Sequence, residues 1–187
     1  MSLSKKPVNL YLFYHDDVDA ATRRIVPKNY LKDCIQELQK VTGREFSIHY
    51  MRSIPGMTDM NYKGYEAQVI ADWDKQVRRY VEQHRLSLEK TDKYLLVTND
   101  QLNENTVGVA YQGKNSLVAS LVTYQAIAHE IGHSLGAVHE DSELQHNAFG
   151  GVCETFVYPN RDTGRGNCYS YSVKNRQRMA DFLSTEP

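Results

Sequence analysis

Hydrophobic residues fall in short blocks whose spacing alternates between that of a strand and that of a helix. Three blocks in the first hundred residues predict strands, because they are short, apolar and bounded by polar chain. They are Val8–Tyr14, Glu45–Met51 and Lys93–Thr98. Apolar residues at helical spacing predict helices over Pro27–Val41 and from Gly64 to about Leu88. Strands that alternate with helices favour an α/β fold around a sheet, which we expect to be mostly parallel.

The second half of the chain predicts two more strands, two helices and much irregular chain. Thr106–Tyr111 and Ser116–Ser120 are short apolar runs typical of strands, and Gly108 within the first favours a sheet edge. One helix is expected from about Val122 to Leu135, and a last one over Ser172–Leu183. The chain between these two helices is rich in glycine and proline turns, so it predicts a mostly irregular segment.

The length and composition indicate one soluble, globular domain. The chain has 187 residues, of which 41% are hydrophobic and 24% charged, close to the average of globular proteins. Disorder and a membrane-embedded chain are thereby disfavoured. We expect a single domain over 1–187, with a sheet-and-helix part at about 1–137 and a smaller C-terminal part at 138–187 that ends in a helix.

The charge pattern offers little to a nucleic acid or a membrane. Lys and Arg number 22 against 23 Asp and Glu, giving a net charge of −1, and no basic run stands out. No segment approaches the roughly 18 apolar residues of a membrane span. The chain's start reads as a strand and not as a signal peptide, so we expect a cytosolic protein or an exported one without its signal. We expect a monomer with neither a nucleic-acid nor a membrane partner.

The three cysteines favour export. Cys34 lies among apolar residues at helical spacing and is expected to be a buried small hydrophobe. Cys153 and Cys168 bracket an irregular stretch, where a disulfide would close a loop of useful size. Two free thiols are the alternative, since the pairing depends on an oxidising compartment. A disulfide would favour a secreted protein, with a cytoplasmic one as the other possibility.

The segment HEIGHSLGAVH, residues 129–139, carries the chemistry of the sequence. His129 and His133 are four residues apart, so a helix places both imidazoles on one face. Gly136 can take the left-handed conformation that ends a helix. The chain can then turn back and bring His139 to the same metal ion.

Three neutral histidines with a fourth position open are the ligand set of a catalytic zinc ion. Imidazole suits zinc better than calcium or magnesium, which prefer oxygen ligands. Glu130 lies about 100° further round the helix, where its carboxylate can reach a water on the metal. A helix with two surface histidines would be the alternative, but it leaves Glu130 and His139 unexplained.

This motif resembles the HExxHxxGxxH signature of the metzincin zinc metalloendopeptidases, and every fixed position is met. The resemblance implies a twisted sheet with helices and one zinc ion held by His129, His133 and His139. It also implies an edge strand that aligns an extended peptide substrate. The residues expected to bind substrate there are Gly108, Val109, Ala110 and Tyr111.

The sequence departs from the metzincins at the turn beneath the zinc ligands, where that family carries a methionine. The corresponding stretch, Cys153–Pro159, contains no methionine. Val157 can take its place, so that Tyr-Pro follows as in several metzincins, or Phe156 can, which puts Tyr158 where astacins and serralysins have a tyrosine near the metal. The glutamate directly after the third histidine, Glu140, is a feature in which the sequence resembles the astacins. These features agree on no subfamily.

We therefore predict a zinc-dependent endopeptidase in which Glu130 serves as general base and then acid. Tyr158 is a second catalytic candidate as a hydrogen-bond donor to the oxyanion, with packing in the turn as its alternative role. The helix around Ile127 and the segment Tyr158–Asp162 are expected to wall the substrate pocket. Two other functions remain open: a silent zinc-containing module that binds peptides, and a zinc hydrolase of non-peptide amides or esters.

Overall fold

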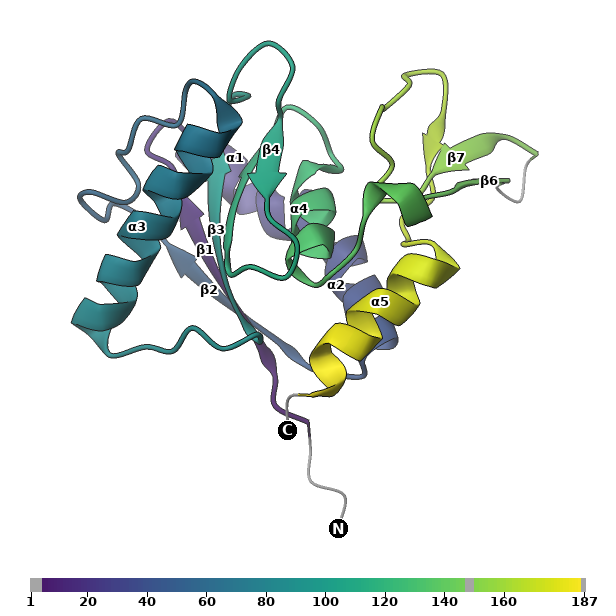
Figure 1. Ribbon diagram of the computed structural model, residues 1–187. Coiled ribbons are helices and arrows are strands. Elements are labelled where there is room, and N and C mark those ends of the chain that lie inside the picture. Colours follow the sequence, from purple (N-terminus) through teal and green to yellow (C-terminus); the bar gives the residue numbers. More distant parts are fainter. Residues whose placement is uncertain (1–4, 147–149, 186–187) are drawn as a thin grey trace.

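The computed structural model describes residues 5–146 and 150–185 and has a five-stranded sheet at its centre (Figure 1). The strands are β1 Val8–Tyr14, β2 Phe46–Met51, β3 Asp92–Thr98, β4 Gly108–Ala110 and β5 Ser116–Ser120. Their order is β2-β1-β3-β5-β4. Neighbours are parallel except β4, which pairs antiparallel with β5 at one edge. The expected mostly parallel α/β sheet is confirmed.

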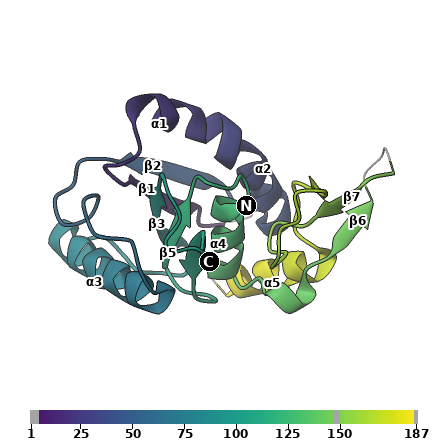
Figure 2. The same ribbon diagram turned by 90° about the horizontal axis from the view of Figure 1, so that it is seen from above.

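Helices cover both faces of this sheet (Figure 2). They are α1 Ala20–Val26, a π-helical turn Pro27–Leu31, α2 Lys32–Thr42, α3 Glu66–His84, α4 Ala126–Ser134 and α5 Val173–Ser184. Side chains of a strand alternate between faces, so neighbours in β1 enter different cores. Leu12 packs with residues of α1, α2 and α4 on one face, whereas Phe13 packs with α3 on the other.

The first helical segment begins earlier than the sequence predicted. Helix α1 starts at Ala20 because the Asp19 side chain caps it, accepting a hydrogen bond from the Thr22 backbone N–H at 2.7 Å. Pro27, expected at the helix start, lies inside the continuous segment. Proline has no N–H to donate, and the π-helical turn that begins there accommodates the interrupted hydrogen bonding.

The C-terminal part holds a second, small sheet that the sequence did not predict. It consists of β6 Leu144–His146, β7 Val152–Glu154 and β8 Gly166–Asn167, in the order β6-β7-β8. This part shares the main core, since Phe156, Tyr171 and Met179 belong to the same buried cluster as Leu12. Helix α5 also packs against α2, where Arg176 donates to the Glu37 carboxylate at 2.7 Å.

In the part of the chain that the structure describes, no helix is both long enough and apolar enough to cross a bilayer.

Candidate metal centre

Helix α4 carries the first two histidines on a buried support. Its apolar residues Ala126, Ile127 and Ile131 are buried against the sheet, which holds the helix in place. The helix begins at Ala126, four residues later than predicted, because the chain before it forms a turn in which the Ala126 N–H bonds to the Thr123 carbonyl. His129 and His133 therefore occupy successive turns of one short helix.

The chain turns back after α4 as the glycine in the motif predicted. Gly136 has φ +100°, and this conformation lets the Ala137 N–H bond to the Gly132 carbonyl. His139 then opens a short 3-10 helix, His139–Asp141.

The three Nε2 atoms meet at one point in space. The distance is 2.9 Å from His129 to His133, 2.9 Å from His129 to His139 and 3.0 Å from His133 to His139. Atoms this close together can all contact one ion at the zinc–nitrogen distance of about 2.0–2.1 Å. In the described part of the chain, these residues are the one group of three or more potential ligands that converges in this way.

The remaining ring nitrogens show which tautomer the site holds. Nδ1 of His129 donates to the Phe156 carbonyl at 3.0 Å, and Nδ1 of His133 donates to the Ala137 carbonyl at 2.9 Å. In a neutral ring the proton is then on Nδ1, so each Nε2 presents a lone pair. Lone pairs facing each other at 2.9 Å repel unless a cation lies between them, so the donor set fits a bound zinc ion.

The surroundings keep the rings of His129 and His133 neutral. Burial, together with the neighbouring His133 and His139, lowers the pKa of His129 to about 3. Burial also lowers the pKa of His133. A neutral imidazole is the form that binds a metal.

Glu130 is a buried carboxyl group beside the three histidines. Its side chain is almost fully enclosed, and burial raises its pKa well above the ordinary value. It packs against Gly108 of β4 so closely that a Cβ there would lie 2.7 Å from Glu130 Oε1. Strand β4 and helix α4 are therefore fitted to each other at the carboxylate.

A cavity of about 450 Å³ opens on this group. Its lining includes His129, Glu130, His139 and Tyr158, so the structure brings these predicted residues together. The predicted substrate-binding strand is placed at the sheet edge, but it reaches the cavity only in part. The lining contains Gly108 but not Val109, Ala110 or Tyr111, and Tyr111 lies just outside β4.

The turn beneath the histidines has an apolar floor without methionine. Phe156 and Val157 are both fully buried. Val157 packs against α4 at Gly132, where a Cβ would lie 3.3 Å from its methyl group, and the Phe156 carbonyl orients His129. The two residues thus share the position that the sequence assigned to one or the other.

Two buried polar residues that sequence reasoning missed hold the chain around the ligands. Lys93 donates from Nζ to the Ser134 carbonyl at the end of α4, at 2.7 Å. Asn175 bonds to both the N–H and the carbonyl of Val138, at 2.9 and 3.0 Å, next to His139. Lys93 stands at the start of an apolar run and Asn175 in a polar stretch, so the residue pattern reveals neither their burial nor their distant partners.

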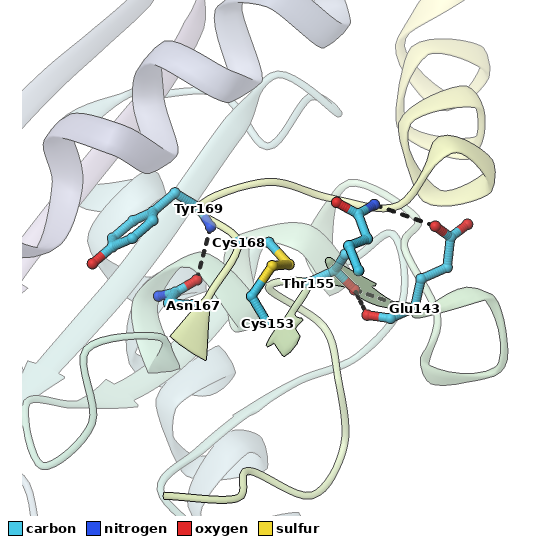
Figure 3. The surroundings of a disulfide bond; sticks show 7 residues. Glu143, Cys153, Thr155, Asn167, Cys168 and Tyr169 are labelled. Carbon is cyan, nitrogen blue, oxygen red and sulfur yellow. Dashed lines mark hydrogen bonds between the residues drawn. A yellow bond between two sulfur atoms is a disulfide. The ribbon is translucent and has the colours of Figure 1, made fainter. Parts of the chain in front are cut away.

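A disulfide joins Cys153 of β7 to Cys168, directly after β8 (Figure 3). It closes the loop that carries Tyr158 and the adjoining cavity wall. The neighbouring strand is fastened as well, because Thr155 and Glu143 exchange backbone and hydroxyl hydrogen bonds. Cys34 is buried and unpaired, and burial raises its pKa to about 12, in keeping with a packing role.

The sequence of the chain matches the model of a known protein family. The family model Reprolysin_5, described as metallo-peptidase family M12, matches residues 77–180, more than half of the chain. The match includes the whole of α4, all three histidines and the disulfide. No curated protein matches the chain significantly.

Proposed function

Because the chain belongs to metallo-peptidase family M12, we propose that it is a zinc-dependent endopeptidase acting on peptide or protein substrates. The observation that carries the proposal is the convergence of three Nε2 atoms within 3.0 Å beside a buried carboxyl group. A cavity large enough for a side chain opens on them.

Zinc bound by His129, His133 and His139 would supply an acidified water and polarise the scissile carbonyl. In the proposed reaction, Glu130 takes the proton from the attacking water and passes it to the leaving amine. Burial raises the pKa of Glu130, and the positive charge of a zinc ion bound beside it would favour the carboxylate form that accepts the proton.

The substrate is proposed to bind as an extended strand along β4. This strand has a hydrogen-bonded neighbour, β5, on one side only, so its other edge can pair with a peptide. Tyr158 lines the cavity together with Glu130, and we assign it the hydrogen bond to the oxyanion. The peptide backbone would then hold its carbonyl between the metal and these two residues.

The test is turnover of quenched-fluorescent peptides and an unfolded protein by zinc-loaded enzyme. A chelator should abolish cleavage, and Glu130→Gln should lower kcat by about 10² or more while zinc content stays the same. Glu82→Gln, an exposed residue of α3, is the matched control and should keep full activity. Equal cleavage by Glu130→Gln would remove Glu130 from the mechanism.

The same experiment separates the two other functions. Wild-type protein that holds one zinc and binds peptides tightly without turnover would be a binding module. Ester or small-amide turnover far above any proteolysis would indicate a non-peptide hydrolase.

The disulfide supports the proposal that the protein is secreted, since such bonds persist in oxidising compartments. We further propose that it acts as a monomer on its peptide substrate, without a nucleic-acid or membrane partner. The balanced charge supports the nucleic-acid part of this proposal.

A further inference from the structure

The cavity beside the metal site is lined by one arginine that has no role in the proposed reaction. Its lining contains one cation, Arg161, in addition to the histidines, and one acid, Glu130, to which the proposed reaction already gives a role. Arg161 forms no ion pair with any other residue among 5–146 and 150–185. Arg165, in the same loop, differs because it pairs with the buried Glu154.

A buried donor in the same lining lacks a partner. Gln125 is 5% exposed, and its Nε2 has no hydrogen bond to any described residue. A buried amide N–H without a partner destabilises the protein, and a ligand oxygen that accepts its hydrogen bond removes that penalty. An unpaired donor in the wall of a cavity therefore points to an acceptor on the ligand.

Gln125 is also the N-cap of α4, so the helix begins at the cavity wall. The nine-residue helix has no side-chain cap and no acidic residue in its first turn. The positive end of its dipole, together with its first N–H groups, thus lacks the anion that such ends usually attract. Thr123 and Ala126, at the same end of α4, line the cavity too.

We propose that this cavity binds a substrate carboxylate, so that the enzyme prefers an acidic residue beside the scissile bond. The proposal rests on the proposed function and specifies its substrate class. Arg161 supplies the opposite charge, Gln125 donates a hydrogen bond, and the N-terminus of α4 adds a favourable field. Apart from Glu130, no acidic side chain lines the cavity to repel the ligand.

The test compares peptides that carry Asp, Asn, Leu or Lys at each of the two positions flanking the scissile bond. Wild-type enzyme should cleave the Asp peptide with a kcat/KM at least about tenfold above that of the Asn peptide, the scale of one charge-assisted hydrogen bond. Arg161→Glu should reverse the preference to Lys. Gln125→Leu, which removes the donor at similar volume, should shrink the Asp preference.

Arg79→Gln is the matched control, because Arg79 is an exposed arginine on α3 and does not line this cavity. It should keep the wild-type preference. Each peptide is also made with a free and an amidated C-terminus. If amidation abolishes the preference, the bound carboxylate is the end of the chain and not a side chain, and the proposal is overturned.

A second measurement separates this proposal from the proposed function. Peptide binding to zinc-loaded Glu130→Gln protein is measured by calorimetry, and the Asp peptide should bind more tightly than the Asn peptide. Equal cleavage of the Asp and Asn peptides, or an Asp preference that survives Arg161→Glu, would overturn the carboxylate site. If no peptide is cleaved at all, the proposed function fails, and the calorimetric comparison alone decides this proposal.

Discussion

The position of the Glu130 side chain depends on the side chain that Gly108 lacks. A Cβ at Gly108 would lie 2.7 Å from Glu130 Oε1 and 2.9 Å from the carbonyl oxygen of Val118. Real contacts of a Cβ are longer than this, so either the carboxylate or the backbone of β5 would have to move. The absence of a side chain at Gly108 therefore allows the edge strand β4 to pack directly against the carboxylate of the proposed catalytic base.

We therefore expect Gly108→Ala to lower kcat by at least about tenfold, because displacing a catalytic group by about 1 Å can cost up to 10²-fold. Zinc content should not change, since the three ligands lie elsewhere. Gly166→Ala, where a Cβ would meet only ordinary contacts of 3.6 Å or more, is the control and should stay active. Full activity of the Gly108→Ala enzyme would show that the carboxylate has room to shift.

At this scale, sequence analysis could find the metal ligands but not the residues that orient them. The spacing of His129 and His133 matches the helical repeat and so predicts two ligands on one face of a helix. Gly136 predicts the turn that brings the third histidine to them. The carbonyl of Phe156, which orients His129, is a backbone group and leaves no trace in the residue type. The same holds for Asn175, whose partner Val138 is 37 residues away.

Among the elements, helix α4 is held at its C-terminal end by a buried lysine. Lys93 of β3 is almost fully buried there, and its Nζ donates to the carbonyls of Ser134 and Lys114 at 2.7 and 3.1 Å. A cation at this end favours the helix dipole and satisfies a terminal carbonyl. The disadvantage is burial of a charge, which lowers the pKa of Lys93 to about 7.

This shift predicts a stability that depends on pH. Between about pH 7 and 10.5 the unfolded chain holds a proton on Lys93 that the folded protein has released, so stability rises with pH. The gain from pH 7 to pH 9 should be about 2 kcal/mol relative to Lys93→Met. Denaturant unfolding of both proteins at the two pH values measures it.

Lys114→Met is the control for that comparison, because the Lys114 side chain is exposed to solvent. The stability difference between Lys114→Met and wild type should be the same at both pH values. A pH-independent difference for Lys93→Met as well would mean that the buried amine keeps its proton throughout.

The elements themselves could be predicted where the chain is regular. β1 and β5 match the predicted ranges Val8–Tyr14 and Ser116–Ser120, because compact apolar runs between polar residues leave little choice. Helix boundaries do not follow from the same pattern. Apolar spacing continues through Pro27, and only the capping interaction of Asp19 shows where the helical segment begins.

In the whole molecule, one buried cluster spans both parts of the chain. Tyr171 belongs to it, and its hydroxyl donates to the Ala128 carbonyl in α4 at 2.6 Å. The small sheet β6-β7-β8 could not be predicted from the residue pattern, because its strands have only two or three residues. They form by pairing with segments that are distant in the sequence. This small sheet is held by hydrogen bonds, such as those between Thr155 and Glu143, and by the covalent disulfide Cys153–Cys168.

Removing this disulfide should therefore lower stability while sparing the metal site. Cys153 and Cys168 are 15 residues apart, and closing a loop of that size restricts the unfolded chain by about 3 kcal/mol. The double variant Cys153→Ala/Cys168→Ala should lose about that much free energy of unfolding. Its zinc content should stay at the wild-type level, because the three histidines precede the loop. Peptide cleavage should weaken in both KM and kcat, since the loop carries Arg161 of the cavity wall and Tyr158, the proposed oxyanion donor.

A reducing agent provides the matched control for that variant. It should lower the stability of the wild-type protein to that of the double variant and leave the variant itself unchanged, since Cys34 is unpaired in both. Denaturant unfolding with and without reductant, at a fixed zinc concentration, makes the comparison. If the double variant were as stable as wild type, the hydrogen bonds between Thr155 and Glu143 would suffice to hold β7. Loss of zinc together with the disulfide would instead show that the loop helps to position the histidines, so that the two parts of the chain form one cooperative site.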